Sequence, residues 1–466
     1  MEPNSLYTSS AALRTGWLAL VCVLVFAAGP PVQAQEEDAS PPAMEPVVVV
    51  GTVKADATGK AEFSKDQIDS IPTADGSAEE LARLLPGVQA ADDSNPSFRG
   101  GEILPPLLSI SGARPYENNF LIDGIGNNSL LDPLEDNPNK IDTLPGHPQE
   151  IFLNSALVEN VTVYDNNIPA KYGGFSGGVV SVETIDPAAE FSGVVRYRTT
   201  RSAWSEFHID DADLDDFNSS STYFRQPEFT KHDAGFLVNV PITKNTGLLA
   251  SYQLLYSEIP ITVVFQPLKL KRKSENFLVK MVSRPTADDT FTAQIIHNPY
   301  SGTYNTSDSL NSEFDIIGGG TSATVAYEHD FSFGKLEASV GFRESENSRS
   351  APLNYFSWSN SASKDWGVLL DSRYSKEGGF GDIETTQKTF EANIDFLAEP
   401  IKTGPGVHLF NLGLSWALMQ GTYDRPKDTY SYNTSFPSRL DPPALVSDPS
   451  ITCLPDDPAC ITANST

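Results

Sequence analysis

Residues Thr389–Ala398 read TFEANIDFLA, and this stretch decides the fold class. Apolar and polar residues alternate along it: the apolar members are Phe390, Ala392, Ile394 and Phe396, and the polar members are Glu391, Asn393 and Asp395. Successive side chains of a β-strand point to opposite faces. The stretch therefore predicts a strand with one apolar face and one polar face.

The same period of two recurs through the C-terminal part of the chain. It is found in Leu248–Tyr256, in Leu336–Phe342 and again in Val407–Met419, where the even-numbered residues from His408 to Leu418 share a face. About nine strands are expected. Their predicted starts lie near Phe191, His232, Thr246, Ser274, Asp289, Gly320, Lys335, Thr386 and Gly406.

Short connections alternate with long ones between these strands. The short ones are Lys244–Thr246, Arg284–Asp289, Ser332–Gly334 and Glu399–Pro405, and the long ones include Ala203–Phe229 and Glu346–Glu384. A β-sandwich with one wet face does not explain this alternation, whereas bacterial transmembrane barrels have short turns at one end and long loops at the other. Residues 188–466 therefore predict an antiparallel transmembrane β-barrel. Because such barrels have an even number of strands, we expect the barrel to be incomplete in this chain.

The composition excludes one large class of function. The 466 residues include 32 Lys and Arg against 61 Asp and Glu, which gives a net charge of −29. Nucleic-acid binding depends on clustered cations that release counterions from phosphates, so a nucleic-acid partner is not expected.

The N-terminus has the pattern of an export signal. Arg14 precedes an apolar run from Trp17 to Ala28, and Val32-Gln33-Ala34 supplies small residues of the cleavage type, so residues 1–34 are predicted to be a signal peptide. The alternative is a buried core helix. In an oxidising compartment, Cys453 and Cys460 are expected to form a disulfide rather than a metal site.

Residues 35–57 form an acidic segment around one β-prone run. This run is Glu45-Pro46-Val47-Val48-Val49-Val50-Gly51-Thr52. It predicts an extended peptide that binds an external partner by strand addition. The alternative is a strand docked on the chain's own domain.

Residues 58–187 predict a small α+β domain. Ser64–Gln67 and Ser77–Glu80 fit the capping box that begins a helix, and Leu81, Leu84 and Leu85 follow with helical spacing. Short strands are expected at Leu107–Ile110, Phe120–Ile122, Val158–Tyr164 and Val179–Val182.

Four motifs in this region, together with Glu45–Thr52 before it, occur in the order found in TonB-dependent outer-membrane receptors, which the chain resembles. Leu84–Val88, with Pro86 and Gly87, is similar to the family's LPGV, and Phe120–Ile125, with Asp123 and Gly124, resembles its LVDGV. Ile110–Arg114, with Gly112 and Arg114, resembles the IRG strand, although Ser111 stands where the family usually has Arg. The end of the plug is resembled by Val158–Tyr164, by Pro169–Gly174 with Tyr172 and Gly173, and by Gly177-Gly178 before Val179–Val182. Glu45–Thr52 resembles the TonB box.

The resemblance implies an α+β plug followed by a barrel of about twenty-two strands, of which this chain would contain about nine. It implies energy-coupled uptake of an extracellular ligand, such as a ferric siderophore or another scarce nutrient, across the Gram-negative outer membrane. A TonB-type protein would bind Glu45–Thr52, outer-membrane lipid and lipopolysaccharide would surround the barrel, and the ligand would meet the loops Asp92–Glu102 and Asn127–Pro148. No cofactor and no catalysis are expected.

Two other functions stay open. The first is a truncated, non-transporting barrel or a surface adhesin. The second is signalling through an additional domain before the box, which is disfavoured because only Gln35–Met44 lies between the cleavage site and the box.

Several residue patterns suggest chemistry that their context does not support. Gly174–Gly178 fits G-x-S-x-G, but a strand rather than a helix follows Ser176. The acidic run Asp210–Asp216 lacks the spacing of a calcium loop, and the six histidines lack the spacing of a zinc site. The basic cluster Lys269–Lys273 is expected beside a long loop, where it either binds lipopolysaccharide phosphates or an anionic ligand, or balances local acids.

Strand parity also predicts a latch between plug and barrel. Glu391, Asp395, Glu337 and Arg343 are expected to face the lumen. One of these carboxylates would then pair with a plug cation such as Arg99 or Arg114.

Overall fold

The computed structural model describes residues 59–74, 76–90, 97–133, 135, 137, 140–220, 222–359, 364, 366–370, 374–404 and 406–434. They belong to one compact unit that begins at Gly51. The predicted signal peptide, the segment Glu45–Thr52 and both cysteines of the predicted disulfide lie outside the described residues.

The N-terminal part of the described chain forms a small mixed sheet with short helices, which we call the small unit (residues 59–187). Its five strands have the order β1-β6-β7-β4-β5, and a separate pair, β2 and β3, is antiparallel. The strands are β1 (Lys60–Ser64), β2 (Val88–Ala90), β3 (Leu108–Ile110), β4 (Asn119–Ile122), β5 (Ile125–Gly126), β6 (Val158–Tyr164) and β7 (Val179–Thr184); the helical segments are α1 (Lys65–Ser70), α2 (Ala78–Ala82), η3 (Pro115–Glu117) and η4 (Ser155–Leu157). The four strands predicted from the sequence are all present.

The small unit has an apolar core that also includes Leu249, Leu278 and Ile296 of the strands described next. Phe63, Leu81, Ile110 and Val161 are fully buried in it, and burial of each such side chain contributes about 1.5–3 kcal/mol. The capping box predicted at Ser64 begins α1, since Ser64 N donates to Gln67 Oε1 at 3.0 Å. The apolar face predicted after Ser77 is wrong at one position: α2 ends at Ala82, and the Leu84 side chain is 56% exposed.

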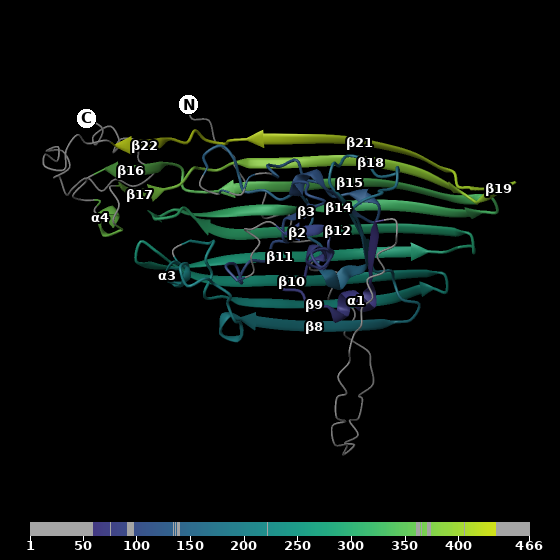
Figure 1. The fold of residues 1–466 in the computed structure, drawn as a ribbon, viewed down its shortest axis with the longest axis horizontal. Coiled ribbons are helices and arrows are strands. Elements are labelled where there is room, and N and C mark those ends of the chain that lie inside the picture. The colour runs from purple at the N-terminus through teal and green to yellow at the C-terminus, as the bar shows by residue number, and fades with distance from the viewer. Residues whose placement is uncertain are drawn as a thin grey trace, which may run out of the picture. The chain divides into compact units, whose positions relative to one another are not determined.

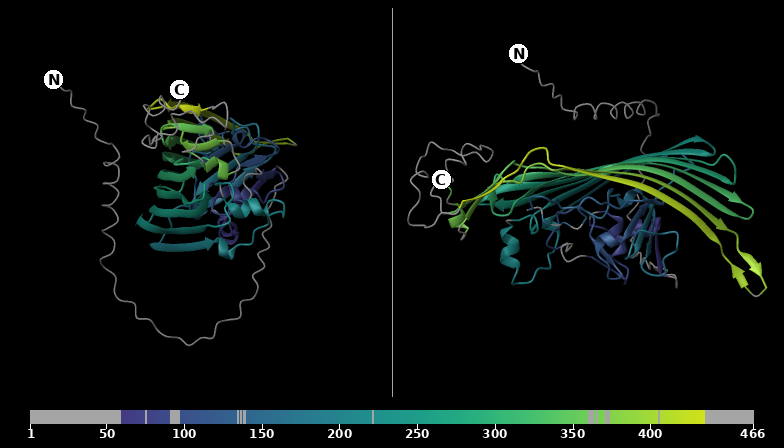
Figure 2. Two further views of the ribbon diagram at one scale, coloured as in Figure 1. Left: turned by 90° about the vertical axis from the view of Figure 1, so that its left-hand side faces the viewer. Right: turned by 90° about the horizontal axis from the view of Figure 1, so that it is seen from above.

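Most of the described residues after the small unit form one large antiparallel sheet of nine strands, the long sheet (Figure 1). Its order is β21-β18-β15-β14-β12-β11-β10-β9-β8, so most neighbours in space are also neighbours in sequence. The strands are β8 (Ser192–Arg201), β9 (Thr230–Thr243), β10 (Thr246–Val263), β11 (Gln266–Ser283), β12 (Asp289–Asn305), β14 (Glu313–Phe331), β15 (Gly334–Ser350), β18 (Glu384–Ala398) and β21 (Asn411–Asp424). All nine predicted strands are therefore present. The sheet is curved, and the small unit lies against its concave face (Figure 2).

The long connections contain structure that the sequence pattern did not predict. The segment Glu346–Glu384 includes β16 (Tyr355–Ser359), α4 (Trp366–Leu369) and β17 (Tyr374–Gly378). With β13 (Ser309–Leu310) and β22 (Ser431–Thr434), these strands form a second sheet of order β13-β17-β16-β22, the loop sheet. The connection before β9 holds η5 (Ser202–Trp204) and α3 (Leu214–Ser219), and the turn after β18 is extended by the pair β19 (Ile401–Thr403) and β20 (Gly406–His408).

One predicted loop is instead a strand. The basic cluster Lys269–Lys273 lies inside β11, which begins at Gln266 rather than near Ser274. It pairs in continuous register with β10, where Glu258 lies opposite Lys271. The alternation of Lys269, Leu270, Lys271 and Arg272 is a strand pattern that the high local charge concealed.

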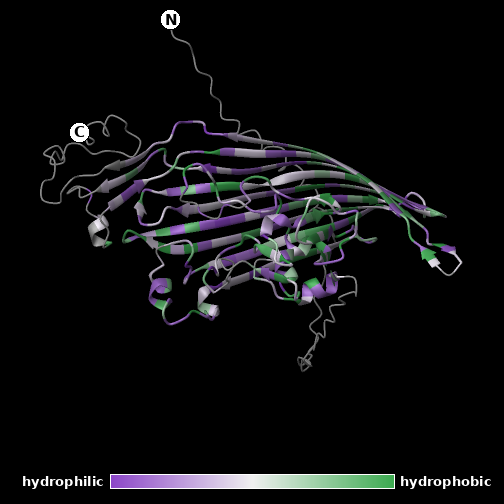
Figure 3. Ribbon diagram, turned by 45° about the horizontal axis from the view of Figure 1, so that its top comes forward, coloured by the Kyte–Doolittle hydropathy of each residue, from purple (hydrophilic) through white to green (hydrophobic). Residues whose placement is uncertain are grey.

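The two faces of the long sheet are reversed relative to a water-soluble protein. On β18, Gln387 and Thr389 are buried at 1% exposure each, whereas their neighbours Phe390 and Ile394 are 39% and 51% exposed. Figure 3 shows the alternation of polar and apolar residues along the strands. No helix among the described residues has the length and apolar character needed to span a bilayer.

Candidate functional site

The candidate site is the interface between the small unit and the polar face of the long sheet. Four groups of contacts hold it together, and three of them are centred on a charged side chain that is buried in the interface.

The first group surrounds Asp123, in the turn between β4 and β5. Thr184 N donates to Asp123 Oδ1 at 2.9 Å, and Gln294 Nε2, from β12, donates to Asp123 Oδ2 at 2.8 Å. Lys280 of β11 lies with its Nζ 3.8 Å from Asp123 Oδ1 and 2.8 Å from Asp186 Oδ1. Asp123 therefore joins two strands of the small unit to two strands of the long sheet.

The second group is centred on Glu150, whose side chain has no exposed surface. Arg343 Nε, from β15, donates to Glu150 Oε2 at 2.5 Å, and Gln387 Nε2, from β18, donates to its Oε1. Beside this pair, Gly126 N donates to Glu391 Oε2 at 3.1 Å. The pair is buried on both sides, so breaking it by removing one partner would be strongly destabilising.

This arrangement corrects the predicted latch. Glu391 faces inward as expected, but it accepts a backbone N–H rather than pairing with a cation of the small unit. Of the predicted cations, Arg114 is exposed and donates to Tyr116 Oη at 2.9 Å, and Arg99 pairs at 3.3 Å with Glu102 of its own unit. The buried ion pair has the opposite polarity, with the carboxylate on the small unit and the cation on the long sheet. Glu337 pairs at 2.9 Å with Lys335 on its own strand, and Asp395 interacts electrostatically with Lys171 of the small unit.

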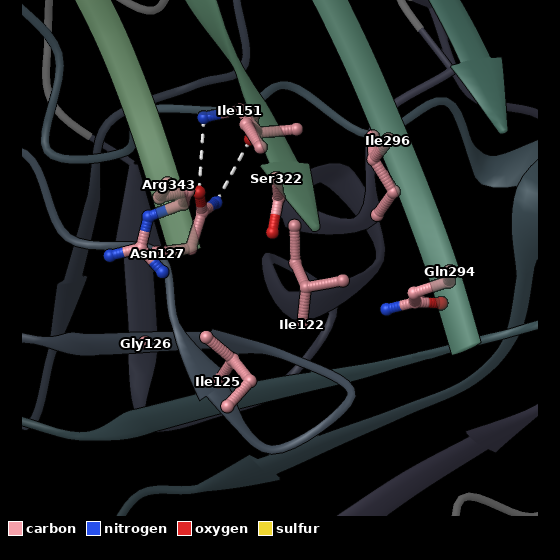
Figure 4. A pocket seen from close by; sticks show the side chains of 9 residues that line it. All are labelled: Ile122, Ile125, Gly126, Asn127, Ile151, Gln294, Ile296, Ser322 and Arg343. Atoms are coloured by element: carbon pink, nitrogen blue, oxygen red, sulfur yellow. Dashed lines mark hydrogen bonds between the residues drawn. The ribbon is translucent and has the colours of Figure 1, made fainter. Parts of the chain in front are cut away.

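A small cavity lies between these two groups. Asn127 Nδ2 donates to Ile151 O at 2.9 Å, and Ile151 N donates to Asn127 Oδ1 at 3.0 Å, at one side of it (Figure 4). Gln294 and Arg343 reach it from the long sheet. The cavity has room for about one water molecule.

The third group joins β11 to the loop before β3. Arg272 Nε lies 3.3 Å from Glu102 Oε2, and Arg99 Nη2 lies 3.3 Å from the same oxygen. Glu102 Oε1 accepts the N–H of Ile103 at 2.9 Å and that of Leu104 at 3.4 Å. Burial alone would raise the pKa of Glu102, but the two arginines outweigh it and lower the pKa to about 2.

The fourth group is formed by Arg349 of β15. Its guanidinium donates to the carbonyl oxygens of Lys140 at 2.8 Å and Ile141 at 2.9 Å, and to those of Phe380 and Gly381 at 3.0 Å each. One buried side chain thus joins a loop of the small unit to the connection before β18.

The motif residues have structural positions that explain their residue types. Asp123 and Gly124 both have positive φ, 48° and 76°, in the turn that places the Asp123 carboxylate. A Cβ on Gly178 would come within 2.3 Å of Ile110 Cγ2, and one on Gly177 within 2.3 Å of Asn118 Oδ1. These last two glycines permit close packing of the strands and turns around them.

The remaining motif residues are not part of the four contact groups. Pro86 is exposed, and a Cβ on Gly87 would come within 2.6 Å of Asp165 Oδ2. Ser111 has a φ of 55° and donates through Oγ to Asp165 O at 2.5 Å, so the residue in place of the family's Arg fixes a turn. Gly112 has a φ of 81°, Gly173 is exposed, and the Tyr172 ring packs 5.3 Å from that of Tyr164.

The patterns set aside in the sequence have no catalytic or metal-binding arrangement in the part of the chain that is described. Ser176 precedes strand β7, and its N–H donates to Glu117 O at 3.0 Å. The run Asp210–Asp216 leads into α3, and Asp216 pairs with Arg225. Across the described ranges, no three His, Cys, Asp or Glu side chains gather as metal ligands would.

The sequence reasoning found Arg343 and Glu391 but missed most other residues of the interface. Lys280, Gln294, Gln387 and Arg349 share one signal, a polar residue at an inward position of a strand with period two. Glu150 and Glu102 lie in irregular segments, where no period exists to mark them.

The outer face of the long sheet carries two rows of aromatic residues. The first row joins Phe236, Tyr252, Phe277 and His297 through ring separations of 6.1, 4.7 and 5.9 Å. The second row includes Phe291, Tyr327, His329, Phe331, Phe333 and Phe396. Phe291 and His297 lie six residues apart on β12, which corresponds to about 20 Å along a strand. Two aromatic belts bounding an apolar band about 25 Å tall are typical of outer-membrane barrels.

Comparisons with known proteins agree with this architecture. No family model matches the chain. Protein YddB of Escherichia coli, described as uncharacterized, is 31% identical over 313 residues, which is 64% of this chain and 39% of YddB.

Two solved structures extend the comparison. The crystal structure of the outer membrane transporter YddB from Escherichia coli superposes with a TM-score of 0.72 at 24% identity, over 81% of this chain and 50% of that one. The siderophore receptor PirA from Acinetobacter baumannii superposes with a TM-score of 0.52 at 16% identity, over 78% of this chain and 48% of that one. The chain thus spans about half the length of the proteins it matches. The resemblance predicted from the motifs is confirmed, and the described residues have the fold of TonB-dependent outer-membrane receptors.

Proposed function

We propose that this chain belongs to a receptor for energy-coupled uptake of an extracellular ligand across the outer membrane. In this proposal the long sheet is part of the wall of a transmembrane barrel, and residues 58–187 are its plug. The observation that carries the proposal is the reversed alternation of the long sheet, whose outward side chains are apolar and whose polar inward side chains hold the small unit. Lipid requires the first property, and a plugged aqueous lumen requires the second.

The class of ligand that we propose rests on analogy with the two proteins of similar fold. PirA is described as a siderophore receptor and YddB as an outer membrane transporter. We therefore propose a ferric siderophore or another scarce nutrient as the ligand. We propose transport without catalysis by this chain.

Energy would enter through Glu45–Thr52. Four consecutive valines favour an extended strand, and such a peptide can pair with the edge of a partner's sheet through its backbone. We propose that a TonB-type protein binds this segment after export and cleavage of residues 1–34.

Deletion of Val47–Val50 tests the coupling. Cells that carry the deletion should lose uptake of iron-55 supplied as ferric siderophores but retain surface binding, because the extracellular side of the receptor is unchanged. Deletion of the same number of residues at Asp38–Pro41 is the control and should leave uptake intact. Normal uptake after loss of the valines would refute the role of this segment.

A further inference from the structure

Arg272 is the most completely buried large cation in the described part of the chain. It lies on the inner face of β11, and its side chain has no exposed surface. Its guanidinium carbon lies 3.8 Å from the centre of the Tyr304 ring. The only carboxylate within salt-bridge distance among the described residues is Glu102, which it reaches through Nε at 3.3 Å.

The hydrogen bonds of Arg272 leave one nitrogen unused. Its Nη1 donates to Lys271 O and Thr303 O, whereas its buried Nη2 has no hydrogen-bond acceptor among the described residues. A buried donor without an acceptor costs about 1–3 kcal/mol, and more when it is charged. A guanidinium also binds a carboxylate or phosphate best through two parallel N–H···O bonds, which Glu102 does not supply.

Glu102 belongs to the small unit, and its one carboxylate is shared between Arg272, Arg99 and the amides of its own loop, so movement of the carboxylate away from Arg272 breaks its bonds to the loop. Its Oε1 accepts two backbone N–H groups, and its own carbonyl oxygen accepts from Lys231 Nζ at 2.8 Å. Gly101 N next to it donates to Gln226 Oε1 at 2.8 Å. The Glu102 carboxylate therefore contacts Arg272 through one oxygen and one nitrogen only, and does not form the two parallel hydrogen bonds that a guanidinium favours.

The surroundings are shaped for the guanidinium. Tyr300 and Tyr304 lie on the same face of β12, with their hydroxyl oxygens 3.0 Å apart. A Cβ on Gly302, between them, would come within 2.7 Å of Tyr300 Oη and 3.1 Å of Arg272 Cδ. Only glycine at this position leaves room for the two rings and the arginine together.

We propose that Arg272 is a recognition residue for an oxyanion group, a carboxylate or a phosphate, of the transported ligand, and that Glu102 occupies its place until the ligand arrives. An entering oxyanion engages Nε and Nη2 together and displaces the Glu102 carboxylate, which loosens the loop Arg99–Leu104. Because Arg272 faces the small unit, the headgroups of surrounding lipid do not reach it. The inference rests on the proposed function and adds to it the chemistry of the ligand.

Hydrogen exchange of the purified full chain in detergent tests the proposal with sodium phosphate as the probe. Phosphate, compared with sodium chloride at the same ionic strength, should accelerate exchange at the Ile103 and Leu104 amides, which lose their acceptor. Glu102→Gln removes the competing charge and should lower the phosphate concentration for half-maximal effect about tenfold, or about 1.4 kcal/mol. Arg272→Gln should abolish the response.

Two further variants keep the outcome interpretable. Glu258→Gln alters an exposed ion pair with Lys269 on the other face of the sheet and should leave the response unchanged. Arg272→Lys keeps the charge but cannot form two parallel bonds, so it should weaken the response even though the chain folds. An undiminished response in Arg272→Lys and Arg272→Gln, or no response of the unmodified chain to phosphate, would overturn the inference. Neither result depends on uptake, so failure here is distinct from failure of the proposed function.

Discussion

At the scale of single residues, the buried Glu150–Arg343 pair is the contact whose stability should change most when one charge is altered. Arg343→Glu places a second carboxylate against a buried one and should lower the free energy of unfolding by about 3–5 kcal/mol. The double variant Glu150→Arg with Arg343→Glu should recover part of this loss because opposite charges again meet. Denaturant unfolding in detergent measures both.

The exposed pair of Lys388 and Glu344 is the matched control for this experiment. Its two side chains are about half exposed and 3.3 Å apart, so Lys388→Glu should cost less than about 1 kcal/mol. A loss at Arg343 no larger than at Lys388 would show that the interface does not depend on the buried pair.

Two buried residues of the small unit predict separate acid transitions. The pKa of Glu102 is lowered to about 2, so its contribution to stability is complete above the unfolded-state pKa of about 4.3 and is lost as the pH falls towards 2. Burial lowers the pKa of His147 to about 4, so the unfolded chain takes up this proton first and stability declines as the pH falls from about 6.5 to 4.

Thermal unfolding between pH 7 and 2 separates the two transitions. Glu102→Gln should reduce the dependence of stability on pH below about pH 4.3, and His147→Asn should reduce it between about pH 6.5 and 4. Identical pH profiles for the two variants would contradict the assignment.

At the scale of elements, the hairpin β10–β11 contains an unfavourable turn. Its two turn residues, Val264 and Phe265, have φ of 46° and 61°, a conformation that favours Asn and Gly. Phe265 is 62% exposed, so its replacement removes little packing. Phe265→Asn should therefore stabilise the chain by about 0.5–1 kcal/mol, and Phe265→Val should destabilise it. Equal denaturation midpoints for the two variants would show that the turn stores no strain.

The elements that the sequence predicted are those with a long, unbroken period of two. Stretches of β10, β15, β18 and β21 have it, because one side of each stretch is mainly polar and the other apolar over many residues. The short strands β16, β17 and β22 were not predicted because each has only four or five residues, and the partner of β22 lies far away in sequence. The strand nature of Lys269–Lys273 was missed because charge on the outer face resembles a loop.

The interface was predictable on one side only. Strand parity placed Arg343 and Glu391 on the inner face, because position along a regular strand fixes direction. It did not give their partners, because Glu150 and Gly126 are brought there by the tertiary fold of the small unit. The polarity of the latch was therefore wrong although its location was right.

At the scale of the whole molecule, the reversed faces predict how the protein contacts lipid. Trp416 is 53% exposed and packs 5.7 Å from Phe390 on the outer face, whereas Trp358 is 5% exposed in the loop sheet. In vesicles of brominated lipid, a variant whose only tryptophan is Trp416 should lose most of its fluorescence, and one that retains only Trp358 should lose little. Equal quenching would contradict the assignment of the outer face to lipid.

The loop sheet has a consequence for the time course of folding. β22 follows the last strand of the long sheet and pairs in parallel with β16, so that Tyr430 N donates to Asn354 Oδ1 across 76 residues of chain. Such distant segments must wait until the intervening hairpins have brought them together, and this closure is slow. The pairing of β16 with β22 therefore forms only after β18 and β21 have joined their neighbours, so the rate at which β16 becomes resistant to proteases reports the completion of the nine strands.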